Sequence, residues 1–321
     1  MEESSTIIED SFFQRNQADP ENFGIGGAIG IFGQSDVTVS RSSFYANASD
    51  SLGAISAFLD SSFLLIKDST FTGNRSESDF FGSGSVLYLQ GSSNTVSLLN
   101  VTITENFHNS GNFDEVGAVG LFLGNEPTDE PSNVLIRNSI ISGNGSPAGG
   151  EGQEISVQGA GGSNSVTIDN SIIGDGSLRA QQGLLIDDPN TFLSLFDDTT
   201  SNVFGFSDAW NIPLRSIIGP RRFGITSTLS TLTAYHPLVL GSSAIDAGVD
   251  LVESEVFPGL SFVFPGCRGV SGIIPQDYRP DQLGRDRPQG RECDIGAVEF
   301  VDESFCWVIP LPSGSAVAPC L

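Results

Sequence analysis

The sequence predicts an all-β protein: a right-handed, single-stranded parallel β-helix of about six coils, followed by a C-terminal cap. Three observations predict this fold. Two short phrases alternate along residues 1–176 with a period of about 30 residues. The segments around them alternate apolar and polar residues with a period of two, which is typical of strands. A βαβ unit would require about ten residues with helical periodicity between strands, and none occur here. The composition agrees, since the chain has 38 glycines and only 17% charged residues.

The first phrase ends in asparagine in five of its six copies. Aligned on that residue, the copies are Asp10-Ser-Phe-Phe-Gln-Arg-Asn16, Arg41-Ser-Ser-Phe-Tyr-Ala-Asn47, Asp68-Ser-Thr-Phe-Thr-Gly-Asn74, Asn100-Val-Thr-Ile-Thr-Glu-Asn106, Asn138-Ser-Ile-Ile-Ser-Gly-Asn144 and the degenerate Asn170-Ser-Ile-Ile-Gly-Asp-Gly176. The five asparagines are 31, 27, 32 and 38 positions apart. A recurring phrase at this period indicates one coil per repeat.

The second phrase recurs in phase with the first. Its copies are Gly27-Ala-Ile29, Gly53-Ala-Ile55, Gly84-Ser-Val86, Gly117-Ala-Val119, Gln153-Glu-Ile155 and Gly183-Leu-Leu185. Short alternating segments lie between the two phrases: Val37-Thr-Val39, Leu65-Ile66, Val96-Ser-Leu98, Val134-Leu-Ile136 and Val166-Thr-Ile168. Each is bounded by Gly, Ser, Asn or Asp, which is typical of strands ending in turns.

Stacking the coils about 4.8 Å apart gives the repeated positions a physical role. We expect an apolar stack inside the coils, formed by Phe13, Phe44, Phe71, Ile103, Ile141 and Ile173. We expect an asparagine ladder at one corner, where this residue tolerates left-handed φ and its amide bonds to its neighbours along the stack: Asn16, Asn47, Asn74, Asn106 and Asn144. The glycine of the second phrase suits a tight corner. The segments of variable length, 17–25, 75–82, 107–116 and 125–132, are predicted to be loops on one pair of corners, where repeat proteins usually bind.

The chain divides into four parts on this interpretation. Coils occupy 1–190, an irregular insertion 191–225, the cap 226–300 and a hairpin-like tail 301–321 that alternates around Ser313-Gly314. The tail is either a docking tab against the last coil or a secretion or anchoring signal. The first residues already read as the second half of a repeat and lack a basic and apolar leader, so the chain looks N-terminally incomplete.

Two resemblances cover most of the chain. The Phe-x-x-Asn phrase, with Gly-Gly-Ala-Ile at 26–29 and its variants at 52–55 and 116–119, resembles the repeat pair of the chlamydial polymorphic outer-membrane proteins. Those are autotransporter-type surface proteins with adhesive β-helical passengers. The resemblance spans residues 1 to about 176 and implies the fold more specifically than the activity.

The second resemblance spans residues 226–300. Its phrases are Leu229-Ser-Thr-Leu232, Tyr235-His-Pro-Leu238, Gly241-Ser-Ser-Ala-Ile-Asp-Ala-Gly248, Asp281-Gln-Leu-Gly-Arg285, Arg287-Pro288 and Cys293-Asp-Ile-Gly-Ala-Val-Glu299. They are similar to the end of bacterial "choice-of-anchor" β-helix proteins, and depart from it at Ser243, Leu283-Gly284 and Val298. The resemblance implies an exported or surface protein with no common enzyme activity.

The cap region concentrates charge and cysteine. Six of its charged residues are expected to form either an ion-pair and hydrogen-bond network closing the open sheet edges or a metal or ligand site: Asp246, Arg285, Asp286, Arg287, Asp294 and Glu299. All four cysteines are late in the chain, which suggests two disulfides, most simply Cys267 with Cys293 and Cys306 with Cys320, although three pairings are possible. A zinc site is the weaker alternative, because no C-x-x-C occurs.

The function predicted is non-catalytic: an exported or cell-surface protein that binds surface glycans or other surface proteins through its corner loops, as a monomer. The net charge of −25 argues against nucleic acid, no apolar run could span a membrane, and no catalytic, cofactor or metal residue is assigned. Calcium is the one metal that stays open, although no Asp-x-Asp-x-Asp-Gly loop is present. The expected location is extracellular, at the cell surface or outer membrane.

The alternative is a polysaccharide-active enzyme, a lyase or glycosidase, with its site in the loops or in missing N-terminal coils. The carboxylate doublets Asp187-Asp188 and Asp197-Asp198 lie after the last coil, and Lys67 is the single lysine. His108 is expected in a solvated loop and His236 in cap packing.

Overall fold

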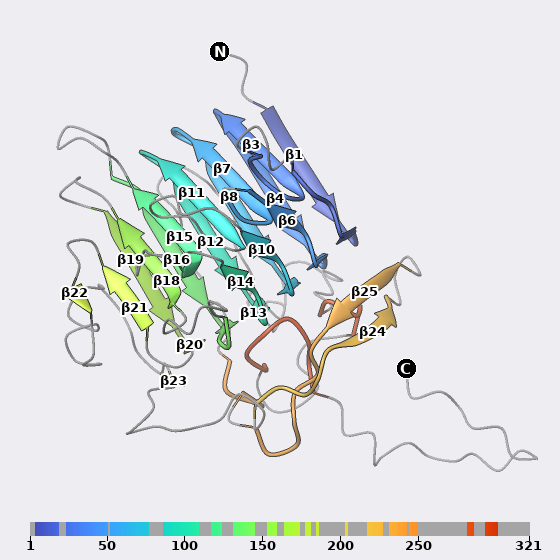
Figure 1. The fold of residues 1–321 in the computed structure, drawn as a ribbon. Helices are drawn as coiled ribbons and strands as arrows, with labels where there is room; N and C mark the ends of the chain where they lie inside the picture. Colours follow the sequence, from blue (N-terminus) through green and yellow to red (C-terminus); the bar gives the residue numbers. More distant parts are fainter. Residues whose placement is uncertain are drawn as a thin grey trace, which may run out of the picture.

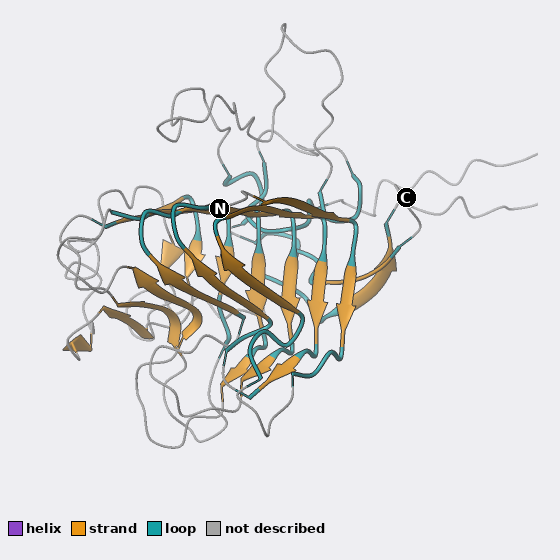
Figure 2. Ribbon diagram, turned by 90° about the horizontal axis from the view of Figure 1, so that it is seen from above, coloured by secondary structure: helices purple, strands orange, loops and turns teal. Residues whose placement is uncertain are grey.

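The computed structural model describes the chain in sixteen stretches: residues 4–18, 24–50, 52–76, 86–108, 117–123, 131–144, 153–158, 164–173, 177–180, 184–185, 203–204, 217–226, 231–242, 244–248, 281–285 and 293–300. These residues form β-strands and turns, with no helix among them (Figures 1 and 2). The predicted all-β class is therefore confirmed for the described part of the chain.

Most strands lie in three long sheets and one short one. Sheet 1 has the order β1 (Ser4–Glu9), β4 (Ser35–Ser40), β8 (Phe63–Lys67), β12 (Thr95–Leu99), β16 (Asn133–Arg137) and β19 (Ser165–Asp169). Sheet 2 has the order β3 (Ile29–Gly33), β7 (Ile55–Leu59), β11 (Leu87–Gly91), β15 (Gly117–Leu123), β18 (Gln153–Gln158), β21 (Ser177–Ala180) and β22 (Leu184–Leu185).

Sheet 3 has the order β2 (Phe12–Gln14), β5 (Ser43–Tyr45), β9 (Thr70–Thr72), β13 (Thr102–Thr104), β17 (Ile140–Ile141), β20 (Ile172–Ile173) and β23 (Val203–Phe204). Sheet 4 contains β6 (Ala48–Ser49), β10 (Arg75–Ser76) and β14 (Phe107–His108). A separate antiparallel hairpin joins β24 (Arg222–Ile225) to β25 (Leu232–Tyr235).

The chain passes through sheets 2, 1 and 3 in turn and then starts again. Each strand pairs with the equivalent strand of the next repeat, and these pairs are parallel, as in β4 with β8 and β5 with β9. Among the described strands of the four sheets, β21 and β22 form the exception, because they pair in antiparallel orientation. This pattern is consistent with a β-helix, because three parallel sheets each add one strand per repeat, and successive strands follow one another along the stack in Figure 1.

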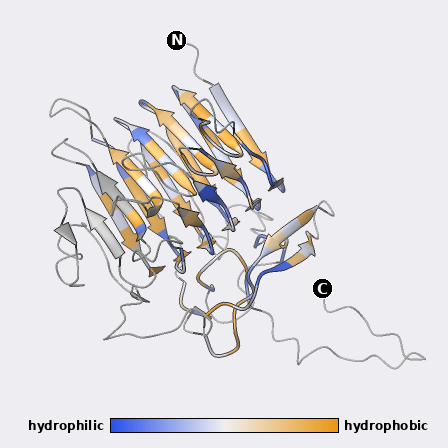
Figure 3. Cartoon of the chain, viewed as in Figure 1, coloured by the Kyte–Doolittle hydropathy of each residue, from blue (hydrophilic) through white to orange (hydrophobic). Residues whose placement is uncertain are grey.

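The interior of the stack confirms the predicted apolar column. The Phe13 and Phe44 rings lie 4.7 Å apart between centroids, and the Phe44 and Phe71 rings 4.5 Å apart, all nearly parallel. Ile103, Ile141 and Ile173 follow in register. Hydrophobic residues recur along the strands in Figure 3, because alternate side chains of each strand enter this core.

The corners differ from the expectation in one respect. The ladder asparagines do not have left-handed φ; the residue directly before each of them does, namely Arg15, Ala46, Gly73, Glu105 and Gly143. A second left-handed residue begins each copy of the first phrase: Asp10, Arg41, Asp68, Asn100, Asn138 and Asn170. The sharp change of direction thus precedes the asparagine, whose side chain is left in position to bond along the stack.

The glycines of the second phrase make the corner that leads into sheet 2. Gly26 and Gly53 have positive φ. Gly27 instead allows a close backbone approach, because a Cβ there would lie 2.6 Å from the carbonyl oxygen of Ala48. The tight corner predicted for this glycine is present, and the close approach of the backbone at Gly27 is a second reason for glycine there.

The C-terminal segment corrects the expected position of the cap. Its described residues pack along the outer side of sheet 3, across several repeats, instead of covering an end of the stack. Gln282 contacts Thr70, the Ala297 N–H donates to Thr102 Oγ1 at 3.0 Å, and the Ala234 N–H donates to Ser43 Oγ at 2.9 Å. An apolar cluster forms where the two parts meet: Ile140, Ile172, Ile217, Ile218, Leu238, Ala244 and Ile295. Outward apolar residues of sheet 3, such as Ile140, explain this packing, since a lateral cover removes them from water.

Candidate functional site

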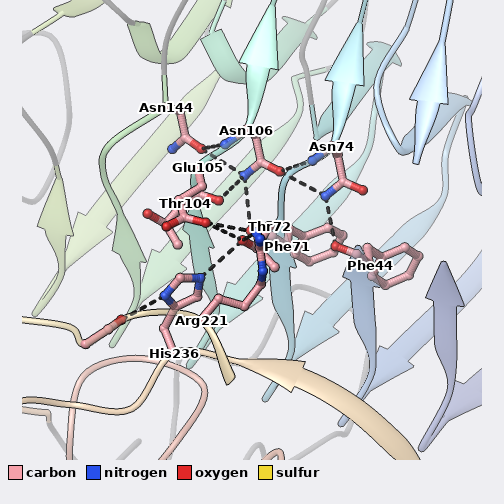
Figure 4. Close-up of polar contacts among 11 residues, drawn as sticks. Phe44, Phe71, Thr72, Asn74, Thr104, Glu105, Asn106, Asn144, Arg221 and His236 are labelled. Atoms are coloured by element: carbon pink, nitrogen blue, oxygen red, sulfur yellow. Dashed lines mark hydrogen bonds and ion pairs between the residues drawn. The ribbon is translucent and has the colours of Figure 1, made fainter. Parts of the chain in front are cut away.

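The most polar contact between sheet 3 and the C-terminal segment is formed by Thr72, Glu105, Arg221 and His236, which we call the polar junction (Figure 4). Thr72 ends strand β9, Glu105 directly follows β13, Arg221 directly precedes β24, and His236 directly follows β25. Equivalent corners of adjacent repeats therefore meet the two ends of the hairpin.

His236 joins both sides of the polar junction. Its Nδ1 lies 3.0 Å from the Gly219 carbonyl oxygen and its Nε2 lies 3.1 Å from Thr72 Oγ1. Because a carbonyl only accepts, the Nδ1–H donates to Gly219, and in the neutral imidazole Nε2 is an acceptor that faces the Thr72 hydroxyl. The same hydroxyl also lies 3.5 Å from Glu105 Oε2. Burial lowers the pKa of His236 from its ordinary value, while the hydrogen bond to Gly219 and the charge of Glu105 act in the opposite direction. The imidazole is neutral in this arrangement.

Arg221 also donates a hydrogen bond to the hydroxyl oxygen of Thr72. Its Nη1 donates to Glu105 Oε2 at 2.9 Å and to Thr72 Oγ1 at 3.3 Å, and its guanidinium lies 4.6 Å from the centroid of the Tyr45 ring. Glu105 has a φ of 56°, a conformation in which most side chains are strained. The residue before every ladder asparagine has this left-handed conformation, so the φ of Glu105 belongs to the corner of the repeat.

The hydroxyl–imidazole contact of the polar junction is closed to solvent, whereas the side chains of Arg221 and Glu105 are 28% and 44% exposed. Thr72 is fully buried and His236 is 3% exposed, so neither atom of this hydroxyl–imidazole contact can be reached by a substrate. All four side chains bond to one another or to the backbone. The geometry therefore indicates docking of the hairpin onto sheet 3, and His236 packs there as expected.

A pH dependence follows from the polar junction. The unfolded chain binds a proton on His236 below pH 6.5, its ordinary pKa, whereas the folded protein, with a lowered pKa, does not. The free energy of unfolding should therefore be insensitive to this group above about pH 6.5 and fall progressively below it. The measurement is the thermal midpoint at about pH 7.5 and about pH 5.5 for the wild type and for His236→Gln, whose amide does not titrate. The variant should lose less stability on acidification; an equal loss in both proteins would contradict the prediction.

The asparagine ladder runs past the polar junction and has a direction (Figure 4). The N–H and Nδ2 of Asn74 both donate to Asn106 Oδ1, at 2.9 Å each, and the same atoms of Asn106 donate to Asn144 Oδ1 at 3.1 and 2.8 Å. Each Nδ2 also donates to a backbone carbonyl, for example from Asn74 to Phe44 at 2.9 Å. The predicted ladder is confirmed from Asn16 to Asn144.

Glu154 closes the ladder where the sixth copy of the first phrase lacks asparagine. Its Oε2 accepts from Asn144 Nδ2 at 2.6 Å, and its Oε1 accepts from the Gly143 and Asn144 N–H groups at 2.9 and 3.3 Å. Glu154 occupies the alanine position of the second phrase, so the departure from Gly-Ala-Ile at 153–155 has a physical reason. Two departures from the repeat could have indicated this end of the ladder in the sequence: the sixth copy of the first phrase lacks asparagine, and the fifth copy of the second phrase has Glu154 in place of alanine.

The acidic residues of the C-terminal segment also have structural partners. Asp281 accepts from the Leu283, Arg285 and Glu299 N–H groups at 2.8, 2.9 and 2.9 Å. Asp294 accepts from Asp246 N–H at 2.8 Å, and Glu299 accepts from Asp294 N–H at 3.1 Å. These carboxylates accept hydrogen bonds from backbone amides, as a structural network requires. Asp286 and Arg287 lie outside the described residues.

The outer face of sheet 2 carries a row of large side chains, one from each of four adjacent strands. Alternation places Phe32, Phe58, Gln90 and Phe122 in one row across β3, β7, β11 and β15, since their neighbours in each strand are core residues. We call these four residues, with Tyr88 beside them, the aromatic row. The Phe32 and Phe58 rings are parallel with centroids 5.5 Å apart, and the Phe58 and Tyr88 centroids are 5.6 Å apart.

The aromatic row combines apolar rings with an amide. Phe32 is 61% exposed, and Phe58, Gln90 and Phe122 are partly exposed. The hydroxyl of the buried Tyr88 donates to Gln90 Oε1 at 2.9 Å, and burial raises the pKa of Tyr88 to about 12, so the phenol stays protonated. The sequence analysis did not single out these residues, although the alternation of Phe32 and Phe58 with core positions was a signal for them.

Other predicted residues have varied outcomes. The expectation that His108 lies in a loop was wrong. Residues Phe107–His108 form strand β14, which pairs with Arg75–Ser76 of β10, so the first two residues of two predicted loops belong to sheet 4. Lys67 ends β8. Cys293 is not a free thiol, but Cys267, Cys306 and Cys320 lie outside the described residues, as do both aspartate doublets, the tail 301–321 and most of the predicted loops.

The described residues contain no cluster of three or more His, Cys, Asp or Glu that could hold a metal ion, and no helix long and apolar enough to cross a membrane. In comparisons with known proteins, no family model, curated protein or solved structure matches the chain.

Proposed function

We propose that the chain is a non-catalytic exported or cell-surface protein, built as a right-handed parallel β-helix of about six coils, that binds surface glycans. The observation that carries the proposal is the aromatic row: one exposed and two partly exposed phenylalanine rings and an amide, one per strand on the outer face of sheet 2. The location rests on the resemblance of both halves of the chain to exported β-helix proteins.

The chemistry of the aromatic row suits a neutral, extended ligand. Pyranose rings have C–H faces that pack against aromatic side chains and hydroxyls that bond to amides. Successive positions are about 4.8 Å apart, so a linear oligosaccharide can contact one position per sugar unit. The net charge of −25 disfavours anionic ligands.

The surroundings of the row support the same function. Segments whose length varies between repeats lead into β3, β11 and β15 or leave β15: residues 17–25, 75–82, 107–116 and 125–132. The chain therefore enters or leaves these strands through sequence of variable length. In repeat proteins such insertions usually form the rim of a binding face.

The test is binding to an array of neutral glycans, followed by affinity measurements on the best ligand. Phe32→Ala with Phe58→Ala should weaken binding by about tenfold, since two ring contacts contribute about 0.5–1.5 kcal/mol each. Phe223→Ala is the matched control, because this ring is also exposed but lies on the β24–β25 hairpin. The proposal fails if no neutral glycan binds or if the control loses as much affinity. Release of shorter oligosaccharides would instead support the polysaccharide-active enzyme.

A further inference from the structure

Gln90 interrupts the aromatic row, with Phe58 on one side and Phe122 on the other. Its amide oxygen already has a partner, because Oε1 accepts a hydrogen bond from the Tyr88 hydroxyl at 2.9 Å. Among the described residues, none accepts a hydrogen bond from its Nε2. The side chain is partly exposed, so the two N–H groups of this amide are the donors that Gln90 offers to a ligand.

Tyr88 determines which end of the amide faces outward. Tyr88 is 5% exposed, and its pKa of about 12 keeps the phenol protonated. The hydroxyl hydrogen therefore needs an acceptor inside the protein, and Gln90 Oε1 is that acceptor in the described part of the chain. Turning the amide over would place Nε2 against the phenol and leave this buried hydrogen without a partner, which is strongly unfavourable. The outward group at this position is thus a donor and not an acceptor.

The neighbours of Tyr88 allow its ring to be buried on the outer face of the sheet. The positions beside it in β7 and β15 are Ser56 and Gly120, so no large side chain competes for this space. The centroid of the Tyr88 ring lies 5.6 Å from that of Phe58. Tyr88 therefore packs against the row and holds the amide of Gln90, two residues further along β11, in one orientation.

The chemistry of the ligand follows from a donor placed between two apolar rings. A hydroxyl and a carbonyl both accept hydrogen bonds, but an acetamido group combines a carbonyl oxygen with a methyl group. When the carbonyl faces Gln90 Nε2, the methyl can pack on the ring of Phe58 or Phe122, an apolar contact that a plain hexose lacks. The acetamido group is uncharged, which suits a protein whose net charge of −25 disfavours anionic ligands.

We propose that the aromatic row selects glycans that contain N-acetylated amino sugars, with Gln90 Nε2 donating to the acetamido carbonyl and Tyr88 acting as the positioning residue for that amide. The inference rests on the proposed function, to which it adds the class of sugar and the residue that selects it. Phe32 and Phe58 supply ring contacts that any pyranose can make, and Gln90 distinguishes one sugar from another.

Chitotetraose and cellotetraose are the probes, because they share one linkage and differ in the acetamido group that replaces a hydroxyl on each sugar. Isothermal titration calorimetry should show that the wild type binds chitotetraose about fivefold more tightly, the gain from one further hydrogen bond. Gln90→Glu retains an acceptor for Tyr88 and loses both donors, so it should abolish this preference. Gln14→Glu adds the same charge at an exposed residue of β2, outside sheet 2, and should keep the preference.

Tyr88→Phe tests the positioning role. The change releases the amide, so the preference for chitotetraose should fall to about twofold. Adding this change to Gln90→Glu should have no further effect on the preference, because the two residues act through one group. The ratio of the two affinities is the readout, since a loss of folding lowers both affinities equally and leaves their ratio unchanged.

The outcomes separate this inference from the proposed function. Equal affinity of the wild type for the two tetraoses would overturn the inference and leave the proposed function standing, as would a preference that survives in Gln90→Glu. An unchanged ratio in Tyr88→Phe would overturn the positioning role of Tyr88. If neither tetraose binds, the inference fails, and binding to the other glycans of the array decides the proposed function separately.

Discussion

Phe71→Ala should lower the free energy of unfolding by about 3–5 kcal/mol, the range for large aromatic side chains removed from a packed core. Phe71 is 1% exposed, its ring stacks on Phe44 at 4.5 Å, and Ile103 follows it in the next repeat. The strands on both sides are held by parallel pairing, so the backbone cannot collapse into the cavity. Urea unfolding followed by circular dichroism gives the measurement.

The matched control is Phe71→Leu, because smaller apolar residues occupy the equivalent position at Ile103 and Ile141. This change should reduce stability by less than about 1.5 kcal/mol. A loss of under about 1 kcal/mol for the alanine variant would show that the column is not tightly packed.

Asn74→Ala should lower the free energy of unfolding by about 2–4 kcal/mol, because it leaves several buried polar groups without partners at once. The side chain is fully buried. Its removal deprives the Asn47 N–H and Nδ2 of their acceptor and the Phe44 carbonyl of its donor. Thermal and urea unfolding measure the effect.

Asn16→Ala is the control for the ladder, since it removes the same chemistry at an exposed end of the stack. Its Nδ2 donates to Asn47 Oδ1, which keeps a second donor from the Asn16 N–H. The expected loss is below about 1 kcal/mol. Equal losses at Asn16 and Asn74 would contradict the view that burial of the ladder makes it essential.

The fold was largely predictable because its repeat constrains each position many times. Phe44 and Phe71 could be placed on one another from sequence, since the phrase spacing sets the register of every parallel pair. The serine that follows the left-handed residue in most copies of the first phrase was not recognised as a second ladder. Ser42 N–H donates to Ser69 Oγ at 3.1 Å and Ser139 N–H donates to Ser171 Oγ at 3.2 Å.

The placement of the C-terminal segment could not be predicted in the same way. The contact between Ser43 and Thr233 spans 190 residues and depends on shape complementarity, which no local pattern encodes. The polar junction has the same origin: His236 and Thr72 are far apart in the sequence, and neither has a neighbour that signals the other. The aromatic row was accessible in principle, but it required the register of sheet 2 before its members could be aligned.

The spacing of the ladder has a consequence for variation in this molecule. Adjacent ladder asparagines are separated by 31, 27, 32 or 38 residues, yet their side-chain bonds keep the same form. Each strand takes its register from the preceding layer and not from the length of chain that leads to it. Segments at the corners can therefore lengthen, shorten or be exchanged while the core residues keep their partners, so the surface of such a protein can diversify independently of its stability.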